Sequence, residues 1–529
     1  MVNPEYRSGA APLTPPVTGD FSGLCPQDGM SYYAQRIQKP PRELRPHDGL
    51  FAWLSIPLGF LFMRYVAFCA DGFAATGFFL LLFALSAVYL RKSGCRPTAA
   101  QSLLGAVICA FSAVFSLTAS TLLHGFCFLF LIAGWVWWLH AVGGGIRFVT
   151  RYFPLDLGSS LLVQPFREYG SAKDAMSETV KKSESAKTVR TVLLGLLVTI
   201  PLTVIVGALL ASADQAVADI FEDLGRLITE DVVTIIAELA FGILAGFWMF
   251  GAVRSGAGRK ENPMPDDGTH AERLSVLRFL PNLGLYAGVT PICLLYLLYV
   301  CTQTNYFLSA FAGRLPEDMI YSDYARRGFF ELCAIAVINL VVLLIMNGCA
   351  KKGGEERPKA LTGYVTALCG FTLFIIATAL AKMILYIDAY GLTRLRLFTA
   401  WFMVLLAAVF LVLILRQFLR KFPTAAVLTA VFIGWFALLC FPRPDALIAD
   451  YNLTRYENRT LKDPDISMLC SLSDDAYTAI AAHYDALDEG LQEYFRAKLE
   501  TRREAYEIHP DQAWNLSAQL LKGASLRDN

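Results

Sequence analysis

A series of apolar runs, each long enough to cross a lipid bilayer, constrains this chain more than any other feature. A transmembrane helix needs about 20 consecutive apolar residues, because the hydrocarbon core of a bilayer is about 30 Å thick. On that rule we count about eleven spans, at 49–69, 72–90, 101–119, 121–140, 190–211, 233–253, 283–302, 328–349, 361–386, 397–415 and 424–440. Only 17% of the residues are charged, whereas soluble domains average about 25%. The expected fold is therefore all-α, a polytopic transmembrane helix bundle.

Lysine and arginine residues cluster before the first span and in every second loop after it, as at Arg91, Lys92 and Arg96. In multi-pass proteins the short loops rich in Lys and Arg stay in the cytoplasm. The intervening loops are poorer in basic residues, and residues 212–232 are acidic. The N-terminus is therefore predicted to be cytoplasmic, and the C-terminal tail extracytoplasmic.

Composition divides the chain into five regions. Residues 1–47 are rich in proline and poor in apolar periodicity, which predicts a disordered cytoplasmic N-terminus. A first four-helix transmembrane group (48–145) follows, then a cytoplasmic loop (146–189) and the main transmembrane bundle (190–440). Within the loop, the stretch from Leu155 to Gly170 could lie along the inner membrane surface; the alternative is a solvated connector near anionic lipid.

The last region, 441–529, is polar and charged, unlike the spans before it. Ser473, Asp474 and Asp475 form a plausible helix start. Three helices are predicted in this tail, over 476–487, 490–507 and 511–521. We therefore expect a small extracytoplasmic helical domain, or a cap packed on the outer face of the bundle.

Charged and polar residues at the outer ends of the eighth and ninth spans mark a candidate binding site. An ionisable group at membrane depth is costly without a partner and is a functional-site hypothesis by default. The candidates are Arg326, Arg327, Glu331, Asn339, Lys382, Asp388, Arg394 and Arg396. If the two spans pack together, these residues form one polar cluster near the outer leaflet. The alternative is structural: an ion pair, since Glu331 follows Arg327 by four residues, and an asparagine that bonds a neighbouring helix.

Several chemistries lack their sequence signals. The six histidines never fall at i, i+4, and the chain has no HExxH, CxxC, GxxxxGK[ST] or GxSxG motif. A net charge of +1 does not indicate a nucleic-acid partner. We therefore predict a protein that is not an enzyme, with no catalytic residues, no metal and no cofactor. The expected partners are the lipid bilayer and either a small-molecule ligand or an envelope protein, and the oligomeric state stays open.

Two stretches and a tail motif carry a family resemblance. Residues 321–332 (YSDYARRGFFEL) and 386–403 (YIDAYGLTRLRLFTAWFM) resemble signature segments of the bacterial multi-pass membrane proteins known as domain of unknown function 4173, close to the related 4153 group. Residues 513–517 (AWNLS) are similar to that family's closing Trp-Asn-Leu-Ser pattern, although its Asp-Trp-Arg-Ser lead-in is missing here. The resemblance implies a Gram-positive bacterial origin and a cell-membrane location, and it implies no activity.

Two function hypotheses follow. In the first, the bundle binds and translocates a small polar or amphiphilic molecule through the outer polar cluster, which predicts a cavity lined by those charges. In the second, the protein is a non-enzymatic membrane sensor or scaffold. Its tail then contacts an envelope partner, and the loop 146–189 passes the signal inside, which predicts a packed bundle with a closed ion-pair network.

Overall fold

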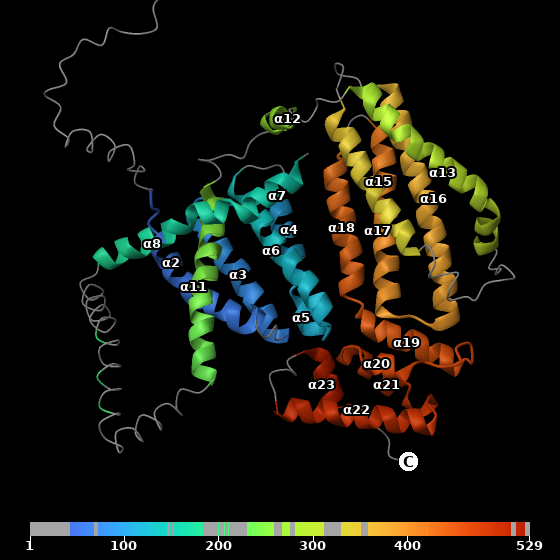
Figure 1. Ribbon diagram of the computed structural model, residues 1–529. Coiled ribbons are helices and arrows are strands. Elements are labelled where there is room, and N and C mark those ends of the chain that lie inside the picture. Colours follow the sequence, from blue (N-terminus) through green and yellow to red (C-terminus); the bar gives the residue numbers. More distant parts are fainter. Residues whose placement is uncertain are drawn as a thin grey trace, which may run out of the picture. The chain divides into compact units, whose positions relative to one another are not determined.

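The computed structural model in Figure 1 confirms an all-α fold: in its described part every regular element is a helix. The described residues are 43–67, 72–144, 149–150, 152–182, 199, 206, 210, 230–258, 267–275, 281–311, 329–350, 358–419, 422–508 and 515–523. Within these ranges nine segments are long and apolar enough to cross a membrane, and a bent helix pair could make a tenth. Most of the predicted span 190–211 and of the acidic stretch 212–232 lies outside them.

The first group of helices matches the first four predicted spans and the sixth. It comprises α2 (Asp48–Phe62), the π-helix η2 (Met63–Ala67), α3 (Gly72–Lys92), α4 (Ala99–Ala110), α5 (Ala113–Leu117), α6 (Thr121–Gly143), α7 (Phe153–Leu162), α8 (Gln164–Lys182) and α11 (Glu230–Ala257). Small residues let α2 and α11 approach closely, because a Cβ on Gly59 would lie 1.8 Å from the Gly242 carbonyl oxygen. Such small-residue contacts are the usual way for membrane helices to pack backbone to backbone.

Within the predicted cytoplasmic loop 146–189, residues 153–182 form two helices. Here α7 and α8 follow one another directly, and α8 packs against both α2 and α11. Leu162 and Phe166, at the join of the two helices, are exposed. This segment therefore forms part of the first group's packing, while its cytoplasmic side stays a prediction.

The second group is built around α16. It comprises α13 (Asn282–Phe311), α15 (Phe329–Cys349), α16 (Lys359–Tyr390), α17 (Arg394–Phe418) and α18 (Thr424–Cys440), and the short α12 (Asp267–Ser275) precedes it. Helices α15, α16, α17 and α18 run side by side (Figure 1), and α13 also packs on α16. Leu368, Met403 and Phe410 are among the fully buried side chains of their shared apolar core.

The tail contains more helix than the sequence predicts. It comprises α19 (Pro444–Glu457), α20 (Ile466–Cys470), α21 (Asp474–Ala482), the 3-10 helix η4 (Tyr484–Ala486), α22 (Glu489–Ile508) and α23 (Leu516–Gly523). Helix α19 is not predicted; it begins at Pro444, a residue suited to the first helical position, and bends by 57° from α18. The tail helices share one hydrophobic cluster that includes Leu453, Phe495 and Leu521. The boundary at residue 441 stays a prediction.

Aromatic side chains join the first group to α18. The Phe111 and Phe436 rings stack with centroids 5.5 Å apart, and Phe130 lies 5.2 Å from Phe436. Close by, the Sγ atoms of Cys127 and Cys440 lie 3.6 Å apart. The contact is therefore apolar, and Cys440 lies four residues before Pro444, where the tail helix α19 begins.

Candidate functional site

The eight candidate residues lie in different environments. Arg326 and Arg327 fall outside the described residues. Glu331, in the first turn of α15, is exposed, and Lys382 is half-buried on α16. None of the six candidates that the structure describes lines the cavity of about 250 Å³ that lies among α3, α4 and α6. The structure does not gather the described candidates into one pocket.

Asn339 is fully buried and joins three helices. Its Oδ1 accepts a hydrogen bond from the Tyr296 hydroxyl of α13 at 2.7 Å, and its Nδ2 donates to Thr372 Oγ1 of α16 at 2.9 Å. Interhelical hydrogen bonds of this kind hold membrane helices together. Asn339 therefore makes the helix-to-helix contact of the structural alternative.

Asp388 and Arg396 lie where α16 gives way to α17, and each has a local partner. Asp388 is exposed and lies 3.1 Å from the Arg455 guanidinium of α19. The Arg396 guanidinium donates to the carbonyl oxygens of Tyr390, at 3.0 Å, and of Gly391. It also lies over the Tyr386 ring, 4.0 Å from the centroid. Both charges are thus engaged by neighbouring protein groups.

Arg394 binds the tail. Its Nε donates to Asp445 Oδ1 at 2.9 Å, and its Nη2 donates to the other oxygen, a two-point arrangement that favours arginine over lysine. Asp445, at the start of α19, is fully buried and also accepts from the Ser473 hydroxyl at 2.6 Å. This contact fixes α19 and the start of α21 to the first turn of α17.

Asp475, at the start of α21, is the second centre of this network and is fully buried. Its carboxylate accepts hydrogen bonds from the hydroxyls of Thr118 and Ser517 and from Arg443 Nε, the last at 3.3 Å. The backbone N–H of Ala119 adds a donor at 3.4 Å. Thr118 and Ala119 lie between α5 and α6, so this carboxylate joins the tail to the first helix group.

We call six residues the tail clasp: Thr118, Arg394, Arg443, Asp445, Asp475 and Ser517. Both carboxylates accept from a guanidinium and from at least one hydroxyl, which is how buried charges become tolerable in proteins. Arg443 itself adopts a left-handed backbone conformation, with φ of 57°, which is uncommon outside glycine and asparagine. Its Nη2 donates to Ser517 at 2.7 Å and to Thr478 at 3.1 Å. The charged and hydroxyl groups of the clasp therefore form hydrogen bonds with one another.

A second tail contact lies beside the clasp. Asn452 of α19 accepts from the Leu392 N–H at 2.7 Å and donates to the Leu392 carbonyl at 2.8 Å. Gly391 has φ of +75°, and a Cβ there would lie 2.6 Å from Asn452 Oδ1. Glycine is therefore required at this turn both by its conformation and by the closeness of the asparagine.

Within the tail, Asp474 ties α21 to α22. It accepts from the Tyr506 hydroxyl and lies 3.1 Å from Arg502 Nε. Burial raises the pKa of the Asp474 carboxyl above its ordinary value, although the hydrogen bond from Tyr506 and the nearby Arg502 charge act in the opposite direction. Burial likewise raises the pKa of Tyr477 to about 12. These groups stabilise the tail's own packing.

A separate charge network lies at the other end of the first group, and the sequence reasoning missed it. Arg254 of α11 contacts Asp48 of α2 and lies 2.9 Å from Glu168 of α8. Asp48 is fully buried and accepts from the Tyr89 hydroxyl at 2.6 Å. The sequence could have indicated this network only through Asp48, an acidic residue at the start of an apolar run, because its partner Arg254 comes 206 residues later.

In the described part of the chain no group of three or more His, Cys, Asp or Glu side chains could hold a metal ion.

These features define a multi-pass α-helical integral membrane protein whose polar tail is bound to its membrane helices. The chain belongs to the family described as domain of unknown function (DUF4153), whose model matches residues 105–483. The match covers most of the chain and includes all of the tail clasp except Ser517. The resemblance to the related 4173 group is not confirmed, and neither is a bacterial origin. No curated protein and no solved structure matches the chain.

Proposed function

We propose that this protein is a non-enzymatic membrane scaffold or sensor, in which the tail is the part that meets a partner. The observation that carries the proposal is the tail clasp, which attaches the tail to two separate groups of membrane helices. Asp475 contacts Thr118, between α5 and α6, and Asp445 contacts Arg394, at the start of α17. A partner that shifts the tail would therefore act on both groups together.

Coupling of this kind requires a physical element that both ends can bias. The tail meets that requirement because its helices share one core, and because Leu397 of α17 packs against that core. The aromatic contact between Phe111 and Phe436 lies in the same region and gives the helix groups a second junction. A displacement of α21 thus has a short route to α5, α6 and α17.

Helix α22 offers the surface that we assign to the partner. Its buried side, with Phe495 and Leu499, packs on the tail core, and its other side is exposed. That exposed side carries Glu493, Tyr494 and Lys498, with the lysine ammonium 5.7 Å from the centroid of the tyrosine ring. A mixed-charge surface with a tyrosine suits another folded protein, because tyrosine is enriched and polar groups rim such interfaces.

Translocation through the outer cluster receives less support from the same geometry. A substrate site needs polar groups that the protein leaves available, whereas Arg394, Arg396 and Asp388 are each engaged by protein groups.

We further propose that the chain lies in a bacterial cell membrane with its N-terminus in the cytoplasm and its tail outside. The alternation of basic loops supports this orientation.

The test is photo-crosslinking in intact cells, with a photoreactive amino acid in place of Tyr494 and, as matched control, of Leu438. Leu438 of α18 is also exposed but belongs to an apolar helix. We expect one discrete protein adduct from position 494 and none from position 438. Adducts of the same proteins from both positions, or no protein adduct from position 494, would contradict the proposal. Reporter domains fused after the tail, one active only outside the cell and one only inside, test the orientation.

A further inference from the structure

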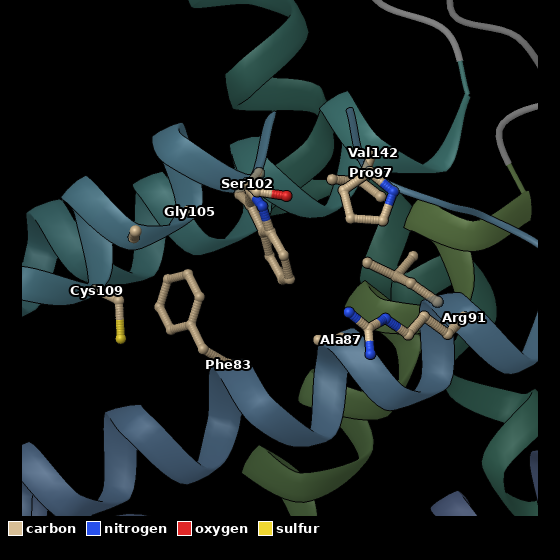
Figure 2. A pocket seen from close by; sticks show the side chains of 11 residues that line it. Phe83, Ala87, Arg91, Pro97, Ser102, Gly105, Cys109 and Val142 are labelled. Carbon is tan, nitrogen blue, oxygen red and sulfur yellow. The ribbon is translucent and has the colours of Figure 1, made fainter. Parts of the chain in front are cut away.

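A groove lies between α3, α4 and α6 (Figure 2), and none of its lining residues belongs to the tail clasp. Its volume is about 250 Å³, and its lining includes Phe83 and Ala87 of α3, Gly105 and Cys109 of α4, and Trp138 of α6. Arg91, in the last turn of α3, also lines the groove, and its guanidinium lies beside Ala87 (Figure 2). The groove is thus apolar along its length and cationic at one end.

Hydrogen bonds join α4 to α6, two of the helices that line the groove. The Gln101 side chain donates to the Ala141 carbonyl at 2.5 Å, and the Trp138 indole donates to the Gln101 carbonyl at 3.0 Å. Gln101 also closes a capping box with Thr98 at the start of α4. A Cβ on Gly105 would lie 2.5 Å from Trp138 Nε1, so the indole lies directly on the α4 backbone. These contacts therefore fix α4 and α6 relative to each other.

The lining of the groove extends along α3 from Arg91 to Phe83. Arg91 and Phe83 are eight residues apart on α3, which corresponds to about 12 Å along the helix axis. Both α3 and α4 belong to segments that qualify as membrane spans. Arg91 ends the apolar run of α3, and residues at the end of a spanning run lie nearer the lipid headgroups than residues in its middle.

Arg91 has no counter-charge in the described part of the chain. It is exposed, and neither a hydrogen bond nor an ion pair of its guanidinium occurs among the described residues. Arg96, in the loop after α3, is also exposed but does not line the groove. The two arginines carry the same charge near the same end of α3, and of the two only Arg91 lines the groove.

We propose that this groove binds one anionic phospholipid, with its phosphate on Arg91 and one acyl chain over Phe83, Gly105 and Cys109. A phosphate accepts a strong charge-assisted hydrogen bond from a guanidinium, and the apolar lining removes an acyl chain from contact with other lipids. A free anion would leave the apolar part of the groove unused. The alternation of basic loops assigns Arg91 to the cytoplasmic side, where the leaflet carries anionic lipid. This inference does not depend on the tail.

The experiment is native mass spectrometry of the full chain in mild detergent, titrated with dioleoyl phosphatidylglycerol or with dioleoyl phosphatidylcholine. We expect one retained phosphatidylglycerol per chain and much weaker retention of phosphatidylcholine. Arg91→Gln should weaken phosphatidylglycerol binding on the order of tenfold, which is about 1.4 kcal/mol, because the phosphate loses its charge-assisted hydrogen bond. Arg91→Lys should retain most of the binding, and Arg96→Gln should bind as the wild type does.

Two further measurements separate the groove from general surface charge. Ala106→Trp places a bulky side chain in the groove from the exposed side of α4, and it should abolish the tight site while the thermal midpoint stays near that of the wild type. Glycerophosphoglycerol, the headgroup without acyl chains, should fail to displace the lipid. Equal losses in Arg91→Gln and Arg96→Gln would overturn the proposal, as would unchanged binding in Arg91→Gln or displacement by the bare headgroup.

Discussion

The tail clasp and the groove between α3, α4 and α6 both contain arginine side chains near the ends of apolar helices. In the clasp the arginines are paired with carboxylates, whereas among the described residues no carboxylate is paired with the arginine in the groove. In the clasp, Arg394 and Arg443 each donate to a fully buried carboxylate. In the groove, Arg91 lies beside apolar side chains without a counter-charge in the described part of the chain. The two regions contain the same chemical group, and only its surroundings differ.

The difference teaches how to read charges near a membrane. A buried carboxylate whose oxygens are all engaged has been stabilised by the fold, so removing one member leaves the other uncompensated and costs several kcal/mol. An arginine next to an apolar hollow contributes little to the fold and has a charge left for a ligand. The clasp should therefore respond to mutation in stability, and the groove in binding.

The largest expected effect is that of Asp475→Ala. The change leaves the Arg443 guanidinium and the Thr118 and Ser517 hydroxyls without their common acceptor. We expect a loss of about 3 kcal/mol of stability, at the lower end of the range for a broken buried pair because Arg443 is partly exposed. Thermal unfolding in one detergent measures it. The matched control is Asp388→Ala, an exposed carboxylate that should cost less than about 1 kcal/mol; equal losses would refute the distinction.

The next effect concerns the Arg394–Asp445 pair, which a double-mutant cycle can isolate. Arg394→Gln alone leaves the fully buried Asp445 without its two-point partner. The double variant Arg394→Gln with Asp445→Asn removes both charges and should recover part of the loss. We expect a coupling energy of about 1–3 kcal/mol from the unfolding midpoints. Strictly additive losses of stability would mean that Arg394 and Asp445 have no coupling energy, which would contradict the prediction.

A smaller effect is expected from Asn452→Ala, which removes two hydrogen bonds to the Leu392 backbone. The loss should be about 1–2 kcal/mol, because the Leu392 groups remain partly buried without a partner. Asn458→Ala is the control, since Asn458 caps the same helix but is exposed. If the two variants unfold at the same temperature, the Asn452 contact does not hold α19 to the membrane helices.

The smallest effect is a pH dependence at His483. Burial lowers the pKa of this imidazole, but the hydrogen bonds that the protonated ring donates to the Glu457 and Asp450 carboxylates outweigh burial, and the net pKa is raised. A raised pKa stabilises the fold fully below the unfolded value of about 6.5, and that contribution is lost as pH rises through the folded value. We expect about half a kcal/mol, since solvent screens the partly exposed partners. His483→Gln should narrow the difference in thermal midpoint between about pH 5.5 and pH 8.5; an unchanged difference would place the dependence elsewhere.

The membrane helices could be predicted because bilayer thickness fixes the length of an apolar run. The run 72–90 becomes α3 at Gly72–Lys92, and the run 361–386 becomes α16 at Lys359–Tyr390. Breaks within and between helices could not be predicted in this way. The run 101–119 divides into α4 and α5, and α19 is polar, so no apolar run predicts it. Length and hydropathy thus predict the spans, whereas the bends between them depend on packing.

The site was predictable only in part, because its partners are far apart in the chain. Arg394 stood out as a charge beside an apolar span, but its partner Asp445 comes 51 residues later. Thr118 and Asp475 are separated by 357 residues, and neither is unusual by itself. Arg91 looked like an ordinary basic loop residue, since the groove beside it exists only once α3, α4 and α6 are packed. Residue type marked the charges, and the fold decides which of them are paired.

Hydrogen exchange measured by mass spectrometry on the wild type and Asp475→Ala tests most directly whether the clasp couples the tail to the membrane helices. In the wild type, the amides of α21 and α23 and those around Thr118 should exchange slowly. In the variant, all three segments should lose protection together, although Thr118 is 357 residues from Asp475 in the chain. Faster exchange confined to α21, with unchanged protection around Thr118 and in α23, would contradict the account.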